Sequence, residues 1–198
     1  MAIDTTPTVP TTLLEAVNTL LNAARVRGIV SLESVNLNVD AAAAKSAIDM
    51  VIREALMPGF EFNTEREVKI DPEVSGEINL PNNPLKVKSY RWQWAPRLVR
   101  RGNRLYDPKK RTYAIGETVT VDIVVALEFA ELPPAAKAYV TAVAARRFAL
   151  PRLPEGATFQ YTEEYLRSAL AAMEQEDADV EDSELKLTSP HFANMGRR

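Results

Sequence analysis

The spacing of apolar residues changes along the chain, and each change marks a different kind of secondary structure. Between residues 12 and 24, apolar side chains recur every three or four positions, which is the repeat of an amphipathic helix. Thr12 and Glu15 form the pattern of a capping box at its start, and we expect Gly28 to end it. The same repeat from about residue 38 to residue 57 predicts a second helix. The two helices are predicted to pair as a hairpin.

From Phe60 to Leu132 the period shortens to about two, which is typical of half-buried strands. Gly102-Asn103 separates two short runs and has the composition of a two-residue hairpin turn. The long β-branched run Thr118–Phe129 is predicted to be the central strand, because such residues fit a pleated, half-buried surface.

The helical repeat returns after this β region. Pro133-Pro134 opens a third helix that Pro151 ends, and a fourth is expected from about Thr158 to Glu176. Two helices, a β region and two more helices cannot make alternating βαβ units. The order therefore predicts an α+β protein, with a four-helix core of two helical hairpins, an inserted antiparallel β subdomain and extended termini.

These elements divide the chain into four parts. We assign residues 12–58 and 133–184 to the helical core and residues 59–132 to the β subdomain. Residues 1–11, rich in threonine and proline, are predicted to be a flexible arm. Residues 185–198 are predicted to be a tail that orders on a partner, because its apolar residues are too few to fold alone. They are Leu185, Leu187, Phe192 and Met195.

The composition argues against catalysis. The 198 residues include no cysteine and one histidine, His191 in the predicted tail, which excludes disulfides, thiolate metal sites and multi-histidine centres. No glycine-rich phosphate loop is present. We expect no enzymatic activity, no cofactor and no metal. The longest apolar runs are far shorter than the roughly 20 residues that cross a bilayer, so no membrane contact is expected.

Charge is distributed unevenly. The segment Lys86–Arg111 holds ten basic residues and one acidic residue, a sum of +9, whereas Glu174–Glu184 holds seven acidic residues and no base, a sum of −7. One interpretation is a solvated sheet edge and a frayed helix end. The other is a subunit that presents opposite signs to different neighbours. Under the second interpretation, the candidate interface residues are Arg97, Arg100, Arg101 and Arg104.

Aromatic residues lie among these bases and leave two further possibilities open. They are Tyr90, Trp92, Trp94, Tyr106 and Tyr113. Basic and aromatic residues on strands are typical of single-strand nucleic-acid platforms. Tryptophan and tyrosine also anchor protein interfaces.

The order of short sequence blocks resembles a known family, the tail tubular protein A (adaptor, or head-to-tail connector) family of short-tailed bacteriophages. The resemblance covers roughly Leu13 to Leu187. The blocks are Ala16–Leu21, the alanine-rich helix opening at Asp40, Gly59–Asn63, Leu80-Pro81, Arg101–Asp107, Phe129–Pro133, Tyr139, Arg146–Phe148 and a final acidic helix.

The resemblance implies a structural virion protein in the neck region of the tail, made in the host cytoplasm. It implies a homo-oligomeric ring, of twelve subunits, between the portal protein and the tail nozzle protein (tail tubular protein B), with tail fibres attached near that junction. DNA would pass through the ring without sequence-specific binding. The alternative is a nucleic-acid-binding β module on a helical scaffold.

Overall fold

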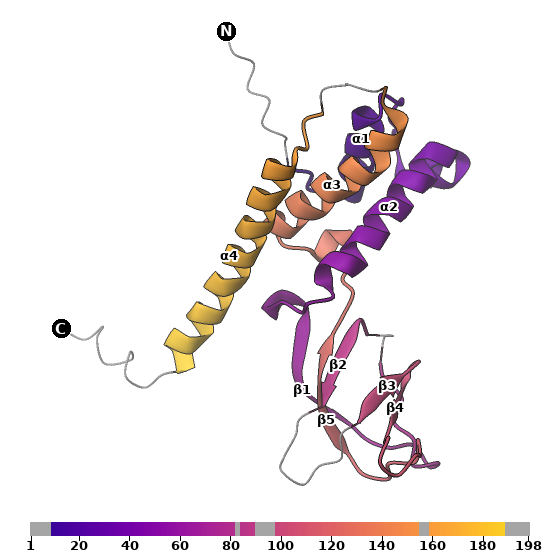
Figure 1. Cartoon of the computed structure of the whole chain (residues 1–198), viewed down its shortest axis with the longest axis vertical. Coiled ribbons are helices and arrows are strands. Elements are labelled where there is room, and N and C mark those ends of the chain that lie inside the picture. Colours follow the sequence, from indigo (N-terminus) through magenta and orange to yellow (C-terminus); the bar gives the residue numbers. More distant parts are fainter. Residues whose placement is uncertain (1–8, 82–83, 90–97, 155–158, 189–198) are drawn as a thin grey trace, which may run out of the picture. The chain divides into compact units, whose positions relative to one another are not determined.

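The computed structural model describes residues 9–81, 84–89, 98–154 and 159–188, with side chains up to residue 180. The fold is α+β, as predicted, and the chain forms two compact units (Figure 1). Residues 56–126 form one unit, called the β unit here. The flanking residues, up to 55 and from 127, form the helical unit.

The described part of the helical unit contains four α-helices: α1 (Leu13–Ala23), α2 (Val39–Leu56, whose last residue belongs to the β unit), α3 (Pro134–Ala149) and α4 (Glu163–Thr188). α3 is central, because α1 and α4 both pack along it. α1 was expected to share its seam with α2, but it packs most extensively on α3. Alanine explains the close approach, since α3 buries a series of short side chains: Ala136, Ala142, Ala144, Ala145 and Ala149.

The first helix begins as predicted and ends differently. The Glu15 amide donates to the Thr12 hydroxyl (3.2 Å), and the Glu15 carboxylate accepts from the Thr12 amide (3.1 Å). The Thr11 hydroxyl and amide also donate to this carboxylate, and these bonds lower the pKa of Glu15. The expectation that Gly28 ends the helix is wrong: the helix ends at Ala23, and Arg25 adopts the left-handed conformation (φ 59°).

Gly28 instead makes room for a side chain of α1. A Cβ atom at Gly28 would lie 2.8 Å from Oδ1 of Asn18. Asn18 Oδ1 accepts from the Ile29 amide (2.8 Å), and Asn18 Nδ2 donates to the Ile29 carbonyl (2.9 Å). The glycine is therefore needed for close approach and not for a helix stop.

α3 and α4 run antiparallel. Glu176 of α4 accepts from the Ala135 amide in the first turn of α3 (3.0 Å), while Arg146 near the other end of α3 donates to Glu163 (3.2 Å). α4 begins later than expected, after Thr162, whose hydroxyl accepts from the Tyr165 amide. It also continues past its expected end at Glu176 as far as Thr188. Residues 177–188 therefore extend about 18 Å beyond the Glu176–Ala135 contact.

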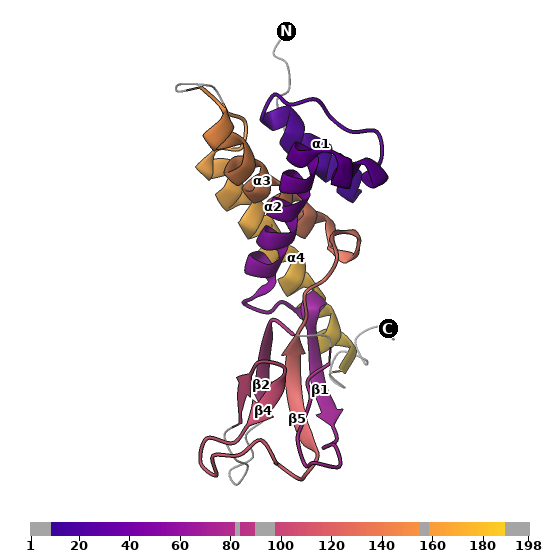
Figure 2. The same ribbon diagram turned by 90° about the vertical axis from the view of Figure 1, so that its right-hand side faces the viewer.

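The β unit contains a three-stranded antiparallel sheet in the order β1 (Thr64–Ile70), β5 (Val119–Val124), β2 (Lys86–Ser89) (Figure 2). β5 is central, as predicted, but it is shorter than the run to Phe129. β3 (Val99–Arg101) and β4 (Arg104–Tyr106) form the predicted hairpin, with Gly102 at φ 64°. The core of this unit comprises Ile78, Leu80, Leu98, Leu105, Val121 and Ile123.

Asn63 joins the two ends of the β unit. Its side chain is buried (1% exposed), and Nδ2 donates to the carbonyls of Leu56 (3.2 Å) and Val125 (2.9 Å). Its Oδ1 accepts from the Phe60 amide (2.8 Å), and its own carbonyl accepts from the Val125 amide (2.9 Å). The chain therefore enters and leaves the β unit at one hydrogen-bonded point.

We expect Asn63→Ala to lower the free energy of unfolding by about 2–4 kcal/mol, because it leaves buried backbone groups without partners. Urea denaturation measures this loss. Asn22→Ala, at an exposed asparagine of α1, is the control and should change stability by less than about 0.5 kcal/mol. Equal effects of the two substitutions would contradict the role given to Asn63.

Candidate interaction surfaces

The β3–β4 hairpin and the loop after it carry a row of two aromatic rings with an arginine at each end. The guanidinium carbon of Arg101 lies 3.7 Å from the centroid of the Tyr106 ring. The Tyr106 ring meets the Tyr113 ring edge-on at 4.9 Å, and Arg104 lies 4.3 Å from the Tyr113 centroid. Such contacts hold the arginine side chains against the rings. The arginines therefore lose less conformational entropy when a partner binds.

Two of the predicted interface arginines bind within the β unit. Arg104 donates to both carboxylate oxygens of Glu77 (2.9 and 3.0 Å), and these bonds raise the pKa of Arg104. Arg100 donates to the Gly102 carbonyl (2.8 Å) and to the Pro84 carbonyl. Both side chains therefore connect the hairpin to neighbouring segments, and only part of each is available to a partner.

Among the described bases of the segment, Lys88, Arg101 and the three bases of the turn that follows β4 are exposed. Asp107 is buried (2% exposed), and its Oδ1 accepts from the amides of Lys109 (2.8 Å) and Lys110 (3.0 Å). This bonding uses the only carboxylate of the basic segment to shape the turn. The basic turn, as we call Lys109, Lys110 and Arg111, is exposed. Its three bases belong to the basic segment of the sequence but were not predicted as interface residues, although Asp107-Pro108 beside them has a turn signature.

The other predicted interface residues are only partly within the described chain. Leu185 and Leu187, expected in an extended tail, belong to the last turns of α4. Arg97, Phe192 and Met195 lie outside the described residues, as do His191 and the aromatic residues Tyr90, Trp92 and Trp94.

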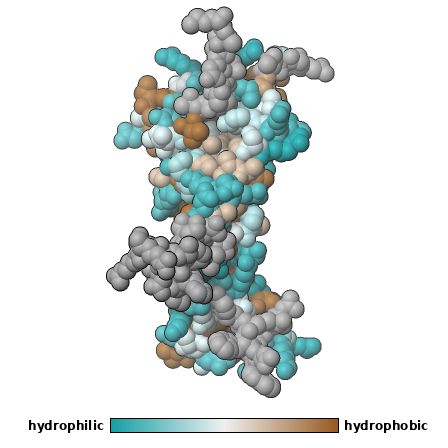
Figure 3. All heavy atoms as spheres, turned by 90° about the vertical axis from the view of Figure 1, so that its left-hand side faces the viewer, coloured by the Kyte–Doolittle hydropathy of each residue, from teal (hydrophilic) through white to brown (hydrophobic). Residues whose placement is uncertain are grey.

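The acidic segment Glu174–Glu184 is helical throughout, so the interpretation of it as a frayed helix end is wrong. Glu176 accepts from α3, and Gln175 donates to Asp179 one turn along (2.9 Å). On the face that Figure 3 shows, hydrophilic residues predominate, with apolar residues exposed among them on the helical unit. The backbone of the acidic segment is therefore part of a continuous helix.

The sequence matches the model of a known protein family over most of its length. The family model with the description “Tail tubular protein” matches residues 14–183, a range that includes residues of both units. The chain belongs to the tail tubular protein family. This tail tubular protein is therefore a structural component of a phage tail, located in the virion tail, and the family implies an oligomeric and non-enzymatic role. No curated protein matches the chain.

Neither a candidate membrane-spanning helix nor a cluster of metal ligands occurs among the described residues. None of the helices there is both long and apolar enough to cross a membrane. Within the same ranges, no three acidic or histidine side chains come together as metal ligands. The family assignment rests on the sequence match.

The hairpin arginines are expected to differ in their effect on stability. Arg104→Ala removes the bonds to Glu77 and the contact with Tyr113, so it should lower the thermal unfolding midpoint by several degrees. Arg101→Ala removes one exposed side chain and should shift the midpoint by less than half as much. Differential scanning fluorimetry of the two variants tests this order, and the reverse order would contradict it.

Proposed function

We propose that this tail tubular protein is the adaptor of a short-tailed phage. Its copies would form a closed ring, of twelve subunits, between the portal protein and the tail nozzle protein, and DNA would pass through the ring. The support is the family membership together with the block order that resembles the tail tubular protein A family.

The separation of charge between the two units is the observation that carries the proposal. The basic turn belongs to the β unit, and the acidic end of α4 belongs to the helical unit. A ring subunit in a tail meets different partners at its different faces, and complementary charge orients each contact. Exposed charges of one sign, gathered in this way, stabilise a lone monomer little.

Each charged surface has a proposed partner. The basic turn and Arg101, with Arg97, would meet an acidic surface of a neighbouring subunit or ring. Arg100 and Arg104 would support this surface from within. The end of the chain, with Leu185, Leu187, Phe192 and Met195, would dock on the portal protein, and tail fibres would attach near the junction with the nozzle.

Reversing charge in the basic turn tests the first contact. Lys109→Glu with Lys110→Glu leaves the backbone bonds to Asp107 intact, so we expect normal unfolding but a loss of tailed particles of roughly 10-fold or more. Negative-stain microscopy of particles made with the variant measures this loss. Arg53→Glu with Lys69→Glu, at two exposed bases elsewhere, is the matched control and should assemble normally.

The second candidate function, single-strand nucleic-acid binding, is favoured by the row of Arg101, Tyr106, Tyr113 and Arg104. The variant Lys109→Glu with Lys110→Glu distinguishes this function from the adaptor function. Assembly that stays normal while the purified protein loses salt-sensitive affinity for single-stranded DNA would replace the adaptor proposal with the nucleic-acid one.

Deleting residues 185–198 tests the portal contact. We expect a folded, helical protein that binds purified portal protein at least 10-fold more weakly, because the apolar anchors are lost. Surface plasmon resonance measures the affinity and circular dichroism the helicity. Leu185→Ser with Leu187→Ser should give part of the loss. If the truncated chain bound portal protein with unchanged affinity, the proposed docking of residues 185–198 on the portal would be wrong.

A further inference from the structure

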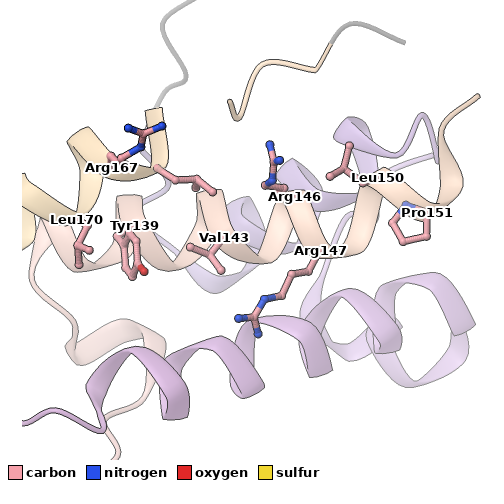
Figure 4. A pocket seen from close by; sticks show the side chains of 9 residues that line it. Tyr139, Val143, Arg146, Arg147, Leu150, Pro151, Arg167 and Leu170 are labelled. Atoms are coloured by element: carbon pink, nitrogen blue, oxygen red, sulfur yellow. The ribbon is translucent and has the colours of Figure 1, made fainter. Parts of the chain in front are cut away.

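An open groove of about 530 Å³ lies along the helical unit between α3 and α4 (Figure 4). Apolar side chains from both helices line it, chiefly Tyr139 and Val143 of α3 and Leu166 and Leu170 of α4. All four are partly exposed. Apolar surface gathered in an open groove of this kind marks a site for an apolar partner segment.

The charges at the groove are all basic. Arg146, Arg147 and Arg167 line it, and none of the described lining residues is acidic. Arg146 pairs with Glu163 of α4 (3.2 Å). Figure 4 shows Arg146 and Arg167 projecting on one side of α3 and Arg147 pointing toward α2, where it pairs with Glu54 (2.5 Å). Arg167 forms no ion pair with any described residue. An occupant of the groove would therefore be apolar and acidic.

Another segment of the helical unit has this composition. We call residues 30–40 the apolar loop: they contain the 3₁₀ turn Leu32–Leu37 and the start of α2. Val30, Leu37 and Val39 are 91%, 90% and 86% exposed. Large apolar side chains this exposed, three within ten residues, are unusual on a monomer.

The apolar loop is ordered and carries the complementary charge. Val35 anchors it in the core (3% exposed), and the Asn38 side chain accepts from the amides of Asp40 (2.9 Å) and Ala41 (3.1 Å). The charged residues of the loop are both acidic, Glu33 and Asp40. Neither forms an ion pair within the described part of the chain.

Within one chain, the apolar loop does not fill the groove. No residue of the loop lines the groove, and its apolar side chains remain exposed. We propose that the apolar loop of one copy docks in the α3–α4 groove of the next copy, with Glu33 and Asp40 beside Arg167. This head-to-tail contact rests on the proposed function, since it is the kind that closes a ring.

Crosslinking tests the contact, because the natural chain has no cysteine to interfere. Leu37→Cys and Leu150→Cys place one thiol on the loop and one at the groove, where Leu150 is a lining residue. A short bismaleimide should join the double variant into a ladder of multimers on a denaturing gel. A mixture of the two single variants should give dimers and no higher species.

Val74→Cys with Leu150→Cys is the matched control, because Val74 is fully exposed on the β unit and lies outside the proposed contact. We expect no ladder from it. Electron microscopy of the same samples separates two failures. Rings without a ladder from the Leu37 pair would overturn the groove contact and leave the adaptor proposal standing. Neither rings nor a ladder at any protein concentration would overturn both.

Charge reversal tests the pairing itself. Glu33→Arg should weaken self-association by roughly 10-fold, and Arg167→Glu in the same chain should restore most of it. Leu37→Ser with Val39→Ser should weaken it by 10-fold to 100-fold and leave monomer stability unchanged, because these side chains are exposed. Sedimentation velocity measures each constant. No effect of the serine pair would overturn the contact.

Discussion

The closure of the β unit depends on Asn63, because this buried amide binds both points where the chain passes between units. An insertion must leave its host and return to it at neighbouring positions, and here the neighbours are Leu56 and Val125. Both carbonyls accept from the same Nδ2 group, while Oδ1 is occupied by the Phe60 amide. A side chain that is both donor and acceptor at fixed spacing is required there. The sheet order β1-β5-β2 extends outward from this point, since β1 begins directly after Asn63 and β5 ends directly before Val125.

Those parts of the fold that depend on local sequence were predictable, and those that depend on distant contacts were not. The capping box at Thr12, the hairpin turn at Gly102 and the central position of β5 follow from neighbouring residues. The role of Gly28 could not be read from its neighbours, because Asn18, ten residues earlier, determines it. The extension of α4 past Glu176 was missed because a run of acidic residues suggested fraying, whereas the helix continues through it.

For the candidate surfaces too, local sequence predicted some features and distant contacts determined the others. The count of charges singled out the basic segment, but a sum of charges does not say which of them are bound within the β unit. Glu77, which lies 27 residues before Arg104, binds that guanidinium, and the buried Asp107 shapes the turn that exposes Lys109 and Lys110. The groove between α3 and α4 had no sequence signal, since its apolar residues have the same helical spacing as core residues.

The sign of the charges on the apolar loop also bears on how copies can meet. Two loops brought face to face would bury apolar surface but would also oppose Glu33 and Asp40 to the same residues of the partner, which disfavours a symmetric dimer. Two grooves brought face to face would oppose arginines in the same way. Like charges therefore act against both self-complementary pairings, and unlike charges favour the one between loop and groove. The loop is also a short 3₁₀ turn and offers no strand edge for a neighbouring chain to extend. A chain with these properties can expose apolar side chains as a free subunit and still associate head to tail only, and such a contact closes into a ring when the rotation between neighbouring copies closes.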